Sequence, residues 1–580
     1  MSNMRATYPV LMAVILFAFA MRLYPVQASL PYTYWHDENN YVEDALRMAG
    51  GNLKPFSYSH GGLYQLVLGI IYGLYFILLK VLGAVTSPAS FLVGYLRDPS
   101  VFFILGRVIS ILCGTSLIYL SYAITAKIFN ARAALIAAIF TGFSLLTFQM
   151  SIFALADVPA TFLLACAFLC VVLSIQKTGD RSLYYAASLL VGLAVAGKLH
   201  CVFGVAFLFV AAFIKYRDER LRSVVALVRM LAAGSAMVMA GFFIGVPSAL
   251  FNIGAVYQDT VVRIGGAHIT VNPNKHRWLY YFTNHMRNGW GVPLEILSLC
   301  GMGYALYRRT RWDLLLVVFP ISQYLIFMNI TGFAYHIIPL SFFVFILAGR
   351  FLDELLSGIL FRRSIFFATL AAALIVFPSF IDSIKLIKVV ASPDTRTIAK
   401  SWIEDNIEKE STVLEEGCLF GNAISSPQLA GNVESVKRDF DGAVAIGGSG
   451  SLQKVKMAYY DELYAGSSLY DVVKVDKLKE SDILSNDPLF IITTSNNDDT
   501  FVSYEMRYFI EEGYYESRNA MKKTLAKRYA LERSFAPTVE FTSFFPHFMD
   551  RDYHALRSIS LAGSKSVIRG PRIDIYRRKL

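Results

Sequence analysis

The chain has 580 residues, of which 55% are hydrophobic and only 17% are charged. A soluble domain of this composition would lack the polar groups that cover a water-facing surface. Apolar runs of about 20 residues recur through the N-terminal part of the chain, and each is long enough to cross ~30 Å of hydrocarbon. The composition therefore excludes a single soluble domain and predicts a polytopic α-helical membrane protein.

Lysine and arginine outnumber aspartate and glutamate by 54 to 43, which gives a formal net charge of +11. In the apolar part most basic residues lie in short connectors, where they set topology and meet anionic headgroups. No nucleic-acid-binding module is recognisable, so we expect membrane lipids and no nucleic acid as partners. Of the six cysteines only Cys418 lies in the polar tail, which excludes a disulfide framework there.

The first apolar segment follows Arg5 and could be a signal peptide cleaved after Ala28. Arg22 interrupts the approach to that site, and the segment is long enough to remain as an anchor. We therefore expect a retained first helix.

Further apolar segments predict about 11–13 transmembrane helices in all. Including the first, the segments are 8–28, 63–85, 101–126, 133–153, 158–175, 182–198, 200–216, 223–250, 291–308, 312–330, 335–352 and 364–385. After Lys388 the composition becomes mixed and polar, and the sequence Ala391-Ser392-Pro393-Asp394 is typical of a boundary. We predict a transmembrane domain over 1–388 and an extracytoplasmic α/β domain over 389–580.

The tail shows both helical and strand patterns. Apolar spacing predicts a helix over 397–407, and continuous apolar runs predict a buried strand over 488–493 and a closing strand over 573–576. A further helix is expected over 501–512. The glycines of 447–450 lack the lysine and spacing of a phosphate loop and indicate a flexible turn.

Charge orients the predicted helices. Basic residues mark connectors that should be cytoplasmic, namely 127–132, 177–181, 215–222, 308–311 and 362–363. The segments 29–62, 154–157, 198–200, 251–290 and 331–334 then lie on the extracytoplasmic side, together with the tail. This assignment requires 63–98 to be a juxtamembrane or re-entrant element, so 29–100 is a first external loop with juxtamembrane helices.

The motif His36-Asp37-Glu38 follows the first apolar segment and opens an amphipathic helix. Val42, Leu46 and Ala49 form one apolar stripe, Glu43, Asp44 and Arg47 point elsewhere, and Gly50-Gly51 ends the helix. Asp37 could be a helix N-cap. It could instead be a general base beside Glu38, which would explain why three such residues stand together.

Asp157 precedes Val158-Pro159 at the start of another apolar helix. This is an ordinary helix start, with Asp157 as its cap. The functional alternative makes Asp157 a second acid in the same external cavity as Asp37, because an acid at a membrane-facing helix start is costly.

Cations occupy apolar surroundings at Arg107 and Lys198, where a lipid phosphate would be a suitable partner. Snorkelling to the interface is the alternative, more so for Lys198. Lys275 and Arg277 lie among aromatic residues, in a pattern that suits a headgroup site or an interfacial belt.

Three motifs form an ordered set: His36-Asp37-Glu38 with Tyr41, Ala45 and Gly50-Gly51; Asp157 with Val158-Pro159; and Asp394-Thr395-Arg396 with Ala399, Trp402-Ile403 and Asn406. This set resembles the polyprenyl-phosphate-sugar-dependent glycosyltransferases of the GT-C fold. The pattern is most similar to the bacterial protein O-mannosyltransferase-like family, which includes the lipid A aminoarabinose transferases. The resemblance covers nearly the whole chain.

The resemblance implies a role for each matching residue. Asp37 corresponds to the catalytic carboxylate with Glu38 as its partner, and Asp157 to the acid of the second external loop. Arg107 resembles the family's arginine early in the next spanning helix, and Lys198 resembles the lysine that ends a later helix. Tyr335-His336 resembles an Arg-Tyr-x-x-Pro-like stretch without its arginine, and His60-Gly61-Gly62 stands where the family has His-Pro-Pro or Glu-Lys-Pro. The resemblance implies that His60, Tyr335 and His336 contact the substrate or its lipid phosphate.

These features predict an inverting glycosyltransferase that moves a sugar from a polyprenyl phosphate to an extracytoplasmic hydroxyl, in the bacterial cytoplasmic membrane. Asp37 would be the general base. A divalent cation held by Asp37 and Asp157 is left open, although no histidine joins them in a clear ligand pattern. An ion-coupled transporter and a membrane sensor with a ligand-binding tail are the alternative functions.

Overall fold

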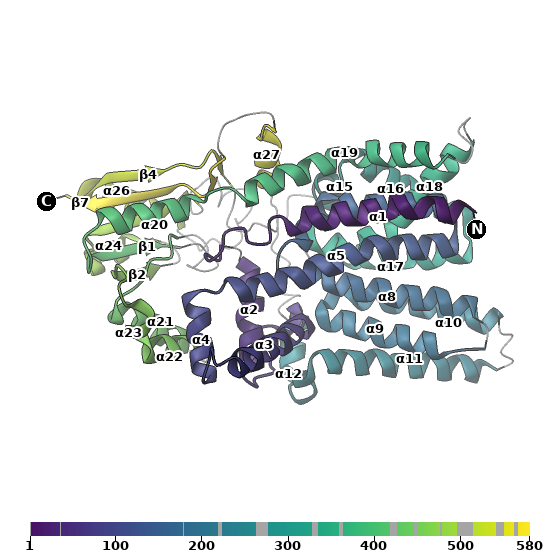
Figure 1. Cartoon of the computed structure of the whole chain (residues 1–580), viewed down its shortest axis with the longest axis horizontal. Helices are drawn as coiled ribbons and strands as arrows, with labels where there is room; N and C mark the ends of the chain where they lie inside the picture. The colour runs from purple at the N-terminus through teal and green to yellow at the C-terminus, as the bar shows by residue number, and fades with distance from the viewer. Residues whose placement is uncertain are drawn as a thin grey trace. The chain divides into compact units, whose positions relative to one another are not determined.

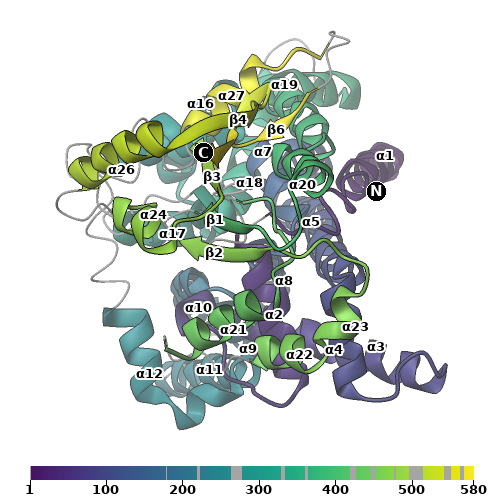
Figure 2. The ribbon, with the colours of Figure 1, turned by 90° about the vertical axis from the view of Figure 1, so that its left-hand side faces the viewer.

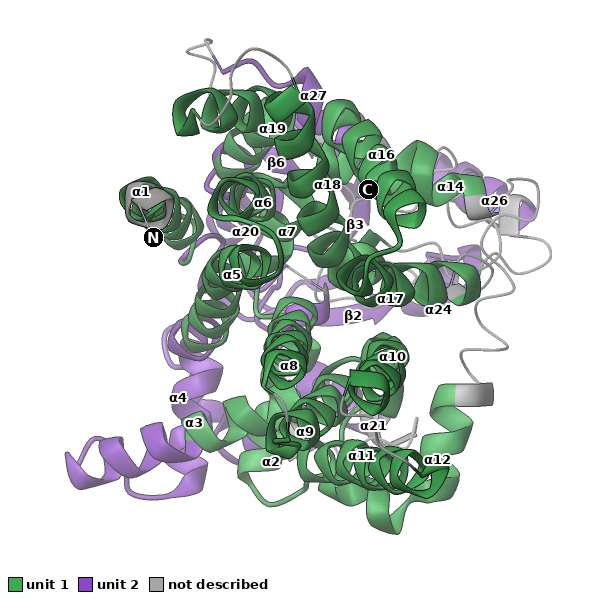
Figure 3. Ribbon diagram, turned by 90° about the vertical axis from the view of Figure 1, so that its right-hand side faces the viewer, with its two compact units in different colours: residues 1–26, 40–72, 104–387 green, residues 27–39, 73–103, 388–580 purple. Residues whose placement is uncertain are grey.

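The computed structural model describes residues 2–34, 36–177, 179–218, 223–262, 277–327, 334–358, 364–417, 426–445, 451–475, 478–495, 514–540, 550–561 and 567–579. They form two compact units (Figure 3). The first contains 1–26, 40–72 and 104–387, and the second contains 27–39, 73–103 and 388–580. The second unit thus includes two segments from the N-terminal part of the chain. The linear division at 388/389 stays a prediction.

The first unit is a bundle of helices (Figure 1). Those that lie wholly or partly in it are α1 (Ser2–Leu23), α2 (His36–Ala49), α3 (Leu63–Val81), α5 (Ser100–Ile128), α6 (Ala131–Phe143), α7 (Leu145–Ser151), α8 (Asp157–Gln176), α9 (Ser182–Gly197), α10 (Gly204–Asp218), α11 (Val224–Gly245), α12 (Ile253–Tyr257), α14 (Arg277–Tyr280), α15 (Arg287–Trp290), α16 (Val292–Arg308), α17 (Arg311–Phe327), α18 (Ile338–Gly358) and α19 (Ile365–Val390).

Seven helices among the described residues are long and apolar enough to cross a membrane, or eight if α6 and α7, which are bent by 57°, form one span. The shorter apolar helices Thr7–Leu23 and α9 accompany them. The predicted segments 291–308 and 312–330 are α16 and α17, with 17 residues each. The predicted polytopic helical fold is confirmed. Because α3 also passes the length test, the re-entrant assignment of 63–98 stays a prediction.

Arg22 packs α1 against the bend between α6 and α7. Its side chain is fully buried, and it donates from Nη2 to the carbonyl of Gly142 at 2.9 Å and from Nε to Ser151 Oγ at 2.9 Å. The guanidinium also lies over the Phe148 ring. A single buried cation therefore binds the Gly142 carbonyl in the last turn of α6 and the Ser151 hydroxyl of α7 at the same time.

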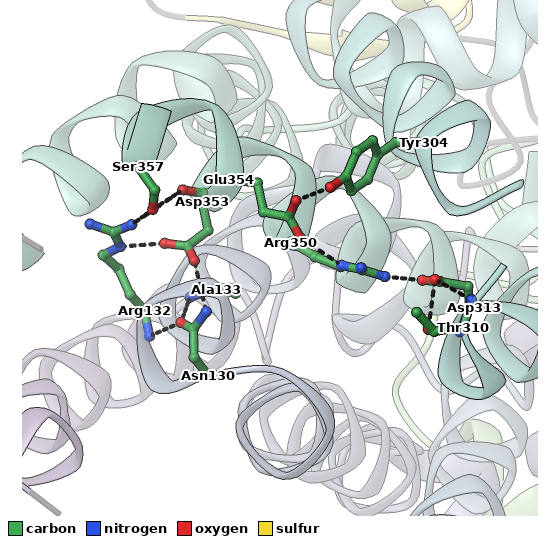
Figure 4. A network of polar contacts seen from close by, with 10 residues as sticks. All are labelled: Asn130, Arg132, Ala133, Tyr304, Thr310, Asp313, Arg350, Asp353, Glu354 and Ser357. Carbon is green, nitrogen blue, oxygen red and sulfur yellow. Dashed lines mark hydrogen bonds and ion pairs between the residues drawn. The ribbon is translucent and has the colours of Figure 1, made fainter. Parts of the chain in front are cut away.

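Polar contacts join the predicted cytoplasmic connectors at one end of the first unit. Arg132 pairs with Asp353 of α18, and Arg350 pairs with Asp313 beside the connector 308–311 (Figure 4). Lys215 donates to the carbonyl oxygens of Ser174 at 2.8 Å and Asp180 at 3.2 Å, and Arg311 pairs with Asp218 at 3.1 Å. Connectors 127–132, 177–181, 215–222 and 308–311 thus share an end, in line with their common predicted side.

The second unit contains a five-stranded sheet with strand order β2-β1-β3-β7-β4 (Figure 2). β1 (Thr412–Glu416) is parallel to β2 (Asp471–Val475) and β3 (Phe490–Thr494), whereas β7 (Ile573–Arg578) is antiparallel to β3 and to β4 (Tyr529–Phe535). β5 (Val539–Glu540) and β6 (Arg569–Gly570) form a separate parallel pair. The helices are α4 (Pro88–Arg97), α20 (Thr395–Asn406), α21 (Val433–Ala445), α22 (Ser451–Ala458), α23 (Tyr460–Tyr464), α24 (Glu480–Asn486), α26 (Tyr514–Arg528) and α27 (Asp550–Ser558).

Helices cover both faces of this sheet. Successive residues of a strand point to opposite faces, so neighbouring residues of β1 pack in different cores. Val413 of β1 packs in a core with Ala399 and Ile403 of α20. Its neighbour Leu414 packs in a second core with residues of α24 and α26, among them Ile483 and Met521. The predicted α/β tail is therefore confirmed, as are its helix at 397–407 and its strands at 488–493 and 573–576. The predicted helix 501–512 and turn 447–450 lie outside the described residues.

The structure corrects one detail of the amphipathic helix α2. Val42 and Leu46 are buried as predicted, and the helix ends before Gly51, which has φ +98°. Ala49 is exposed, however, and Asp44 is buried. The chain after α2 folds back, and the Phe56 N–H donates to Asp44 Oδ2 at 3.0 Å. This hydrogen bond stabilises the carboxylate of Asp44 in its buried position.

The Asp313–Arg350 pair provides a test of the packing at the connector end. Both side chains are buried, at 0% and 7% exposure, so Asp313→Ala leaves a cation without its closest partner. We expect a loss of about 3 kcal/mol, seen as a lower thermal unfolding midpoint in detergent. Adding Arg350→Met should restore part of the loss. Asp218→Ala, which breaks the exposed pair with Arg311, is the control and should cost about 0–1 kcal/mol. Equal midpoints for Asp313→Ala and wild type would contradict this account.

Candidate functional site

A buried ion pair lies at the end of the first unit opposite the connectors. Lys198 Nζ is 3.3 Å from Asp157 Oδ1, and the two side chains are 4% and 1% exposed. Asp157 occupies the first turn of α8, and Lys198 follows the last residue of α9. Since α8 spans 20 residues, about 30 Å, this end lies far from the connector after α8. Two charges removed from water in this way depend on each other.

The geometry settles two alternatives left open by the sequence. The N-cap of α8 is Ala156, so the interpretation of Asp157 as a cap is wrong. Lys198 is 3% exposed and points to Asp157 within the protein, so it does not snorkel. Both residues instead form one buried centre.

Two tyrosines flank the lysine of this centre. Lys198 Nζ lies 4.8 Å from the ring centroid of Tyr335 and 5.7 Å from that of Tyr41. Tyr41 is held in turn by edge-on contacts with the rings of Tyr64, at 5.6 Å, and Phe56, at 5.8 Å. A desolvated ammonium over aromatic faces gains cation–π attraction, which adds to the ion pair in holding it in place.

Histidines extend the centre. The His200 ring lies 5.4 Å from that of His336 at an interplanar angle of 89°, and His336 packs against Tyr335 at 4.3 Å. The carbonyl of His336 accepts from Gln323 Nε2 at 2.6 Å. Tyr335 and His336 were predicted as site residues, but His200 was not. Its position two residues after Lys198 was the only signal in the sequence.

The glycine pair after His60 docks directly on the end of α9. The Gly62 N–H donates to the Ala196 carbonyl at 2.8 Å. Gly61 has φ +75°, and a Cβ there would lie 2.4 Å from the carbonyl oxygens of both Ala196 and Gly197. Only glycine permits this approach. His60 itself contacts Phe56 and Ser59, and its predicted role at the donor phosphate stays a prediction.

Arg107 lies in α5, beside the segment that leads into Asp157. It is 1% exposed, donates from Nη1 to the Val26 carbonyl at 2.9 Å and lies 5.9 Å from the Phe153 ring centroid. The Ser110 hydroxyl of the same helix donates to the Leu155 carbonyl at 3.2 Å. The predicted contact of Arg107 with a lipid phosphate stays a prediction.

Asp37 and Glu38 occupy the first turn of α2 and belong to the second unit. The helix begins at His36, so neither acid is the N-cap, and the helix dipole favours both carboxylates there. Glu38 is buried and Asp37 half-buried. Tyr41 follows Asp37 by one helical turn. The predicted convergence of Asp37 with Asp157 joins residues of different units and stays a prediction.

Other predicted ligand positions are described only in part. Lys275 lies outside the described residues, and Arg277 begins α14 with a side chain that is not described. Within the described part of the chain, no group of three or more His, Cys, Asp or Glu side chains could hold a metal ion. The divalent cation at Asp37 and Asp157 stays a prediction.

A cavity of about 490 Å³ lies in the second unit at the end of β3. Thr493, Thr494, Ser495, Arg518 and Arg572 contribute to its lining. Arg518 pairs with Glu416, and Arg572 pairs with Asp574 at 3.1 Å. Acids within the unit thus balance both arginines.

Comparisons with known proteins agree with this architecture. A family model described as dolichyl-phosphate-mannose-protein mannosyltransferase matches residues 103–242. No curated protein matches the chain. The apo crystal structure of ArnT from Cupriavidus metallidurans has a TM-score of 0.50 at 13% identity, over 85% of this chain and 94% of that one.

Two further solved structures are similar. ArnT from the same organism bound to undecaprenyl phosphate has a TM-score of 0.48 at 15% identity, over 85% of this chain and 93% of that one. The Archaeoglobus fulgidus oligosaccharyltransferase in complex with zinc and sulfate has a TM-score of 0.42 at 16% identity, over 69% of this chain. The match spans only 60% of that oligosaccharyltransferase. The predicted resemblance to GT-C glycosyltransferases is confirmed.

Gly61→Ala tests the docking of the loop on α9. We expect a loss of stability larger than the ~1–2 kcal/mol of a left-handed backbone alone, because the added Cβ meets two carbonyl oxygens. Gly51→Ala is a matched control, since Gly51 has φ +98° and no atom within 4 Å of its Cβ position. Thermal unfolding in detergent compares the two variants. If Gly61→Ala lowered the midpoint no more than Gly51→Ala, the close approach to α9 would be refuted.

Proposed function

We propose that this protein, which has the GT-C fold of membrane glycosyltransferases, moves a sugar from a polyprenyl phosphate to a hydroxyl of an acceptor. The observation that carries the proposal is the buried Asp157–Lys198 pair with its flanking tyrosines. Asp157 and Tyr41 belong to the motifs that carry the resemblance, and the resemblance matches Lys198 and Tyr335 to further positions of the family. The mannosyltransferase family match over 103–242 includes both members of the pair. The donor lipid is undecaprenyl or decaprenyl phosphate.

In this proposal Asp37 is the general base. It takes the proton of the acceptor hydroxyl while the hydroxyl oxygen attacks the anomeric carbon. The bond between the anomeric carbon and the phosphate oxygen breaks, its electron pair stays with the polyprenyl phosphate, and the configuration inverts. Glu38 is buried and follows Asp37 directly, and in this proposal it is the partner of the Asp37 carboxylate.

The cations act on the leaving phosphate. Lys198 stabilises the charge that grows on the phosphate oxygen, and such a donor is typically worth ~3–4 kcal/mol in the transition state. Asp157 and the two tyrosine rings keep the ammonium charged and in place. Arg107, His60, Tyr335 and His336 complete the phosphate and lipid contacts in this proposal, together with Lys275 and Arg277.

The protein is an integral membrane protein by its apolar helices. We place the reaction on the extracytoplasmic face of a bacterial cytoplasmic membrane, because the shared end of the basic connectors suits the cytosol. The acceptor is a lipid, a glycan or a protein, and the sugar is a hexose or a pentose.

Replacing Asp37 tests the base assignment. With purified protein in lipid and a radiolabelled polyprenyl-phosphate sugar, we expect Asp37→Asn to lower kcat by about 10²–10⁴-fold with the donor KM unchanged. Glu43→Gln, an exposed site in the same helix, is the control. A near wild-type rate for Asp37→Asn would reject the assignment. Label that crosses the vesicle wall without appearing on an acceptor would favour transport instead.

Replacing Lys198 tests the phosphate assignment. We expect Lys198→Met to lower kcat/KM by about 10²–10³-fold, since a charged donor to the leaving group is lost. Lys198→Arg should recover part of the rate because it keeps the charge. Lys80→Met, at an exposed position of α3, is the control. Undiminished transfer by the Met variant would show that the leaving phosphate does not use this cation.

A further inference from the structure

The segment that leads into α2 is held within the second unit by Tyr34. This side chain is 1% exposed, and its hydroxyl shares a hydrogen bond with Thr397 Oγ1 of α20 at 3.0 Å. The Arg396 guanidinium lies 3.9 Å from the ring centroid of Tyr34. Burial and the nearby Asp394 raise the pKa of Tyr34, so the phenol stays neutral and the contact is a cation–π contact.

Asp394 holds Arg396 in this position. Arg396 donates from Nε to Asp394 Oδ1 and from Nη2 to Oδ2, each at 2.7 Å, so the guanidinium plane is fixed by two parallel bonds. Both residues are buried. Burial alone would raise the pKa of Asp394, but Arg396 and Arg569 lower it below its usual value. The acid is therefore charged when it orients the arginine.

Arg569 forms a second attachment. It lies 3.7 Å from Asp394 Oδ2, donates to the Ser392 carbonyl at 3.1 Å and donates from Nη2 to the hydroxyl of Ser29. Its neighbour Gly570 has φ +112°, and a Cβ there would lie 2.4 Å from Thr395 Oγ1. The start of α20 is thus packed tightly against β6.

The carbonyl of Thr33 connects these attachments to α2. It accepts from Asn39 Nδ2, in the first turns of α2, at 3.0 Å, and from Gln428 Nε2 at 3.3 Å. Asp37 lies between the two residues that this bond joins. The segment 27–39 is therefore fixed to the tail at Ser29, Thr33 and Tyr34, immediately before the proposed base.

We propose that Asp394, Arg396 and Arg569 are positioning residues, which hold the segment 27–39 and thereby place the Asp37 carboxylate for proton transfer. This inference rests on the proposed function. It gives the Asp394-Thr395-Arg396 motif a task in the reaction, although the motif lies more than 350 positions after Asp37 in the sequence.

The physical reason is the short reach of a general base. The carboxylate must lie within about 3 Å of the proton that it takes, and a misplacement of ~1 Å can cost about 10²-fold in rate. Between α1 and α2, the described residues 24–34 include no strand and no helix that could fix the start of α2 locally. Planar, charge-assisted contacts from the tail supply that order.

The experiment uses the full-length protein in lipid. We expect Arg396→Met and Tyr34→Leu to lower kcat by about 10–100-fold with the donor KM unchanged. The conservative Tyr34→Phe keeps the ring over Arg396 and should retain most of kcat. Arg438→Met is the matched control, because it breaks another Arg–Asp pair of the second unit, with Asp471, that does not contact the segment 27–39. Thermal midpoints measured alongside identify any variant that fails to fold.

A double-variant cycle separates positioning from a merely structural role. Asp37→Glu displaces the carboxylate and should slow transfer measurably. If Arg396 acts through Asp37, the loss in Arg396→Met/Asp37→Glu will be smaller than the product of the single losses. Losses that multiply, a rise in KM alone, or full activity in both Arg396→Met and Tyr34→Leu would overturn the inference. The proposed function fails on a different result, namely an undiminished rate in Asp37→Asn.

Discussion

A charge that is buried in a protein needs a partner, and this constraint organises the end of the first unit that lies opposite the basic connectors. Lys198 follows α9 and Asp157 opens α8, and their buried side chains form an ion pair. The start of α8 and the end of α9 therefore lie together, and the neighbouring loops pack around them. Tyr41 and Tyr335 cover the ammonium, and the 61–62 loop packs against the last turn of α9.

Several features of the site were predictable because they depend on local sequence. The start of α2 at the His36-Asp37-Glu38 motif, its end at the glycine pair and the helix start at Asp157 all follow from short-range rules. The polytopic fold followed from apolar length alone. Lys198 was predicted as a cation in apolar surroundings and the resemblance added Tyr335, and the structure brings the two side chains to one centre.

What could not be predicted depends on residues that are distant in the sequence. Taken alone, Asp157 could be a helix cap and Lys198 could be a snorkelling lysine. Neither position by itself predicts the ion pair between them. The inward orientation of Asp44 depends on the Phe56 amide, which the helical stripe cannot reveal. His200 carries no motif, and its packing against His336 becomes visible only when the turns 199–203, after α9, and 334–337, before α18, are brought together.

The boundary near residue 388 also shows the difference between features set by local sequence and features set by distant residues. A change in composition along the chain indicates where one kind of sequence ends. It contains no information about which earlier segments pack with the new domain. Tyr34, Thr33 and Ser29 lie in a stretch that reads as an ordinary connector, yet their partners are residues of the tail, namely Thr397, Gln428 and Arg569.

The conformation of Gly61 limits how this loop can be exchanged with that of related sequences. A proline there would require φ near −65°, whereas Gly61 has +75° and no room for a ring beside the α9 carbonyls. A graft of the His-Pro-Pro sequence at 60–62 would therefore need a shift of the backbone at Ala196 and Gly197, because the atoms in the way are main-chain carbonyl oxygens. The loop and the end of α9 form a coupled pair, and in this lineage we expect them to change together or not at all.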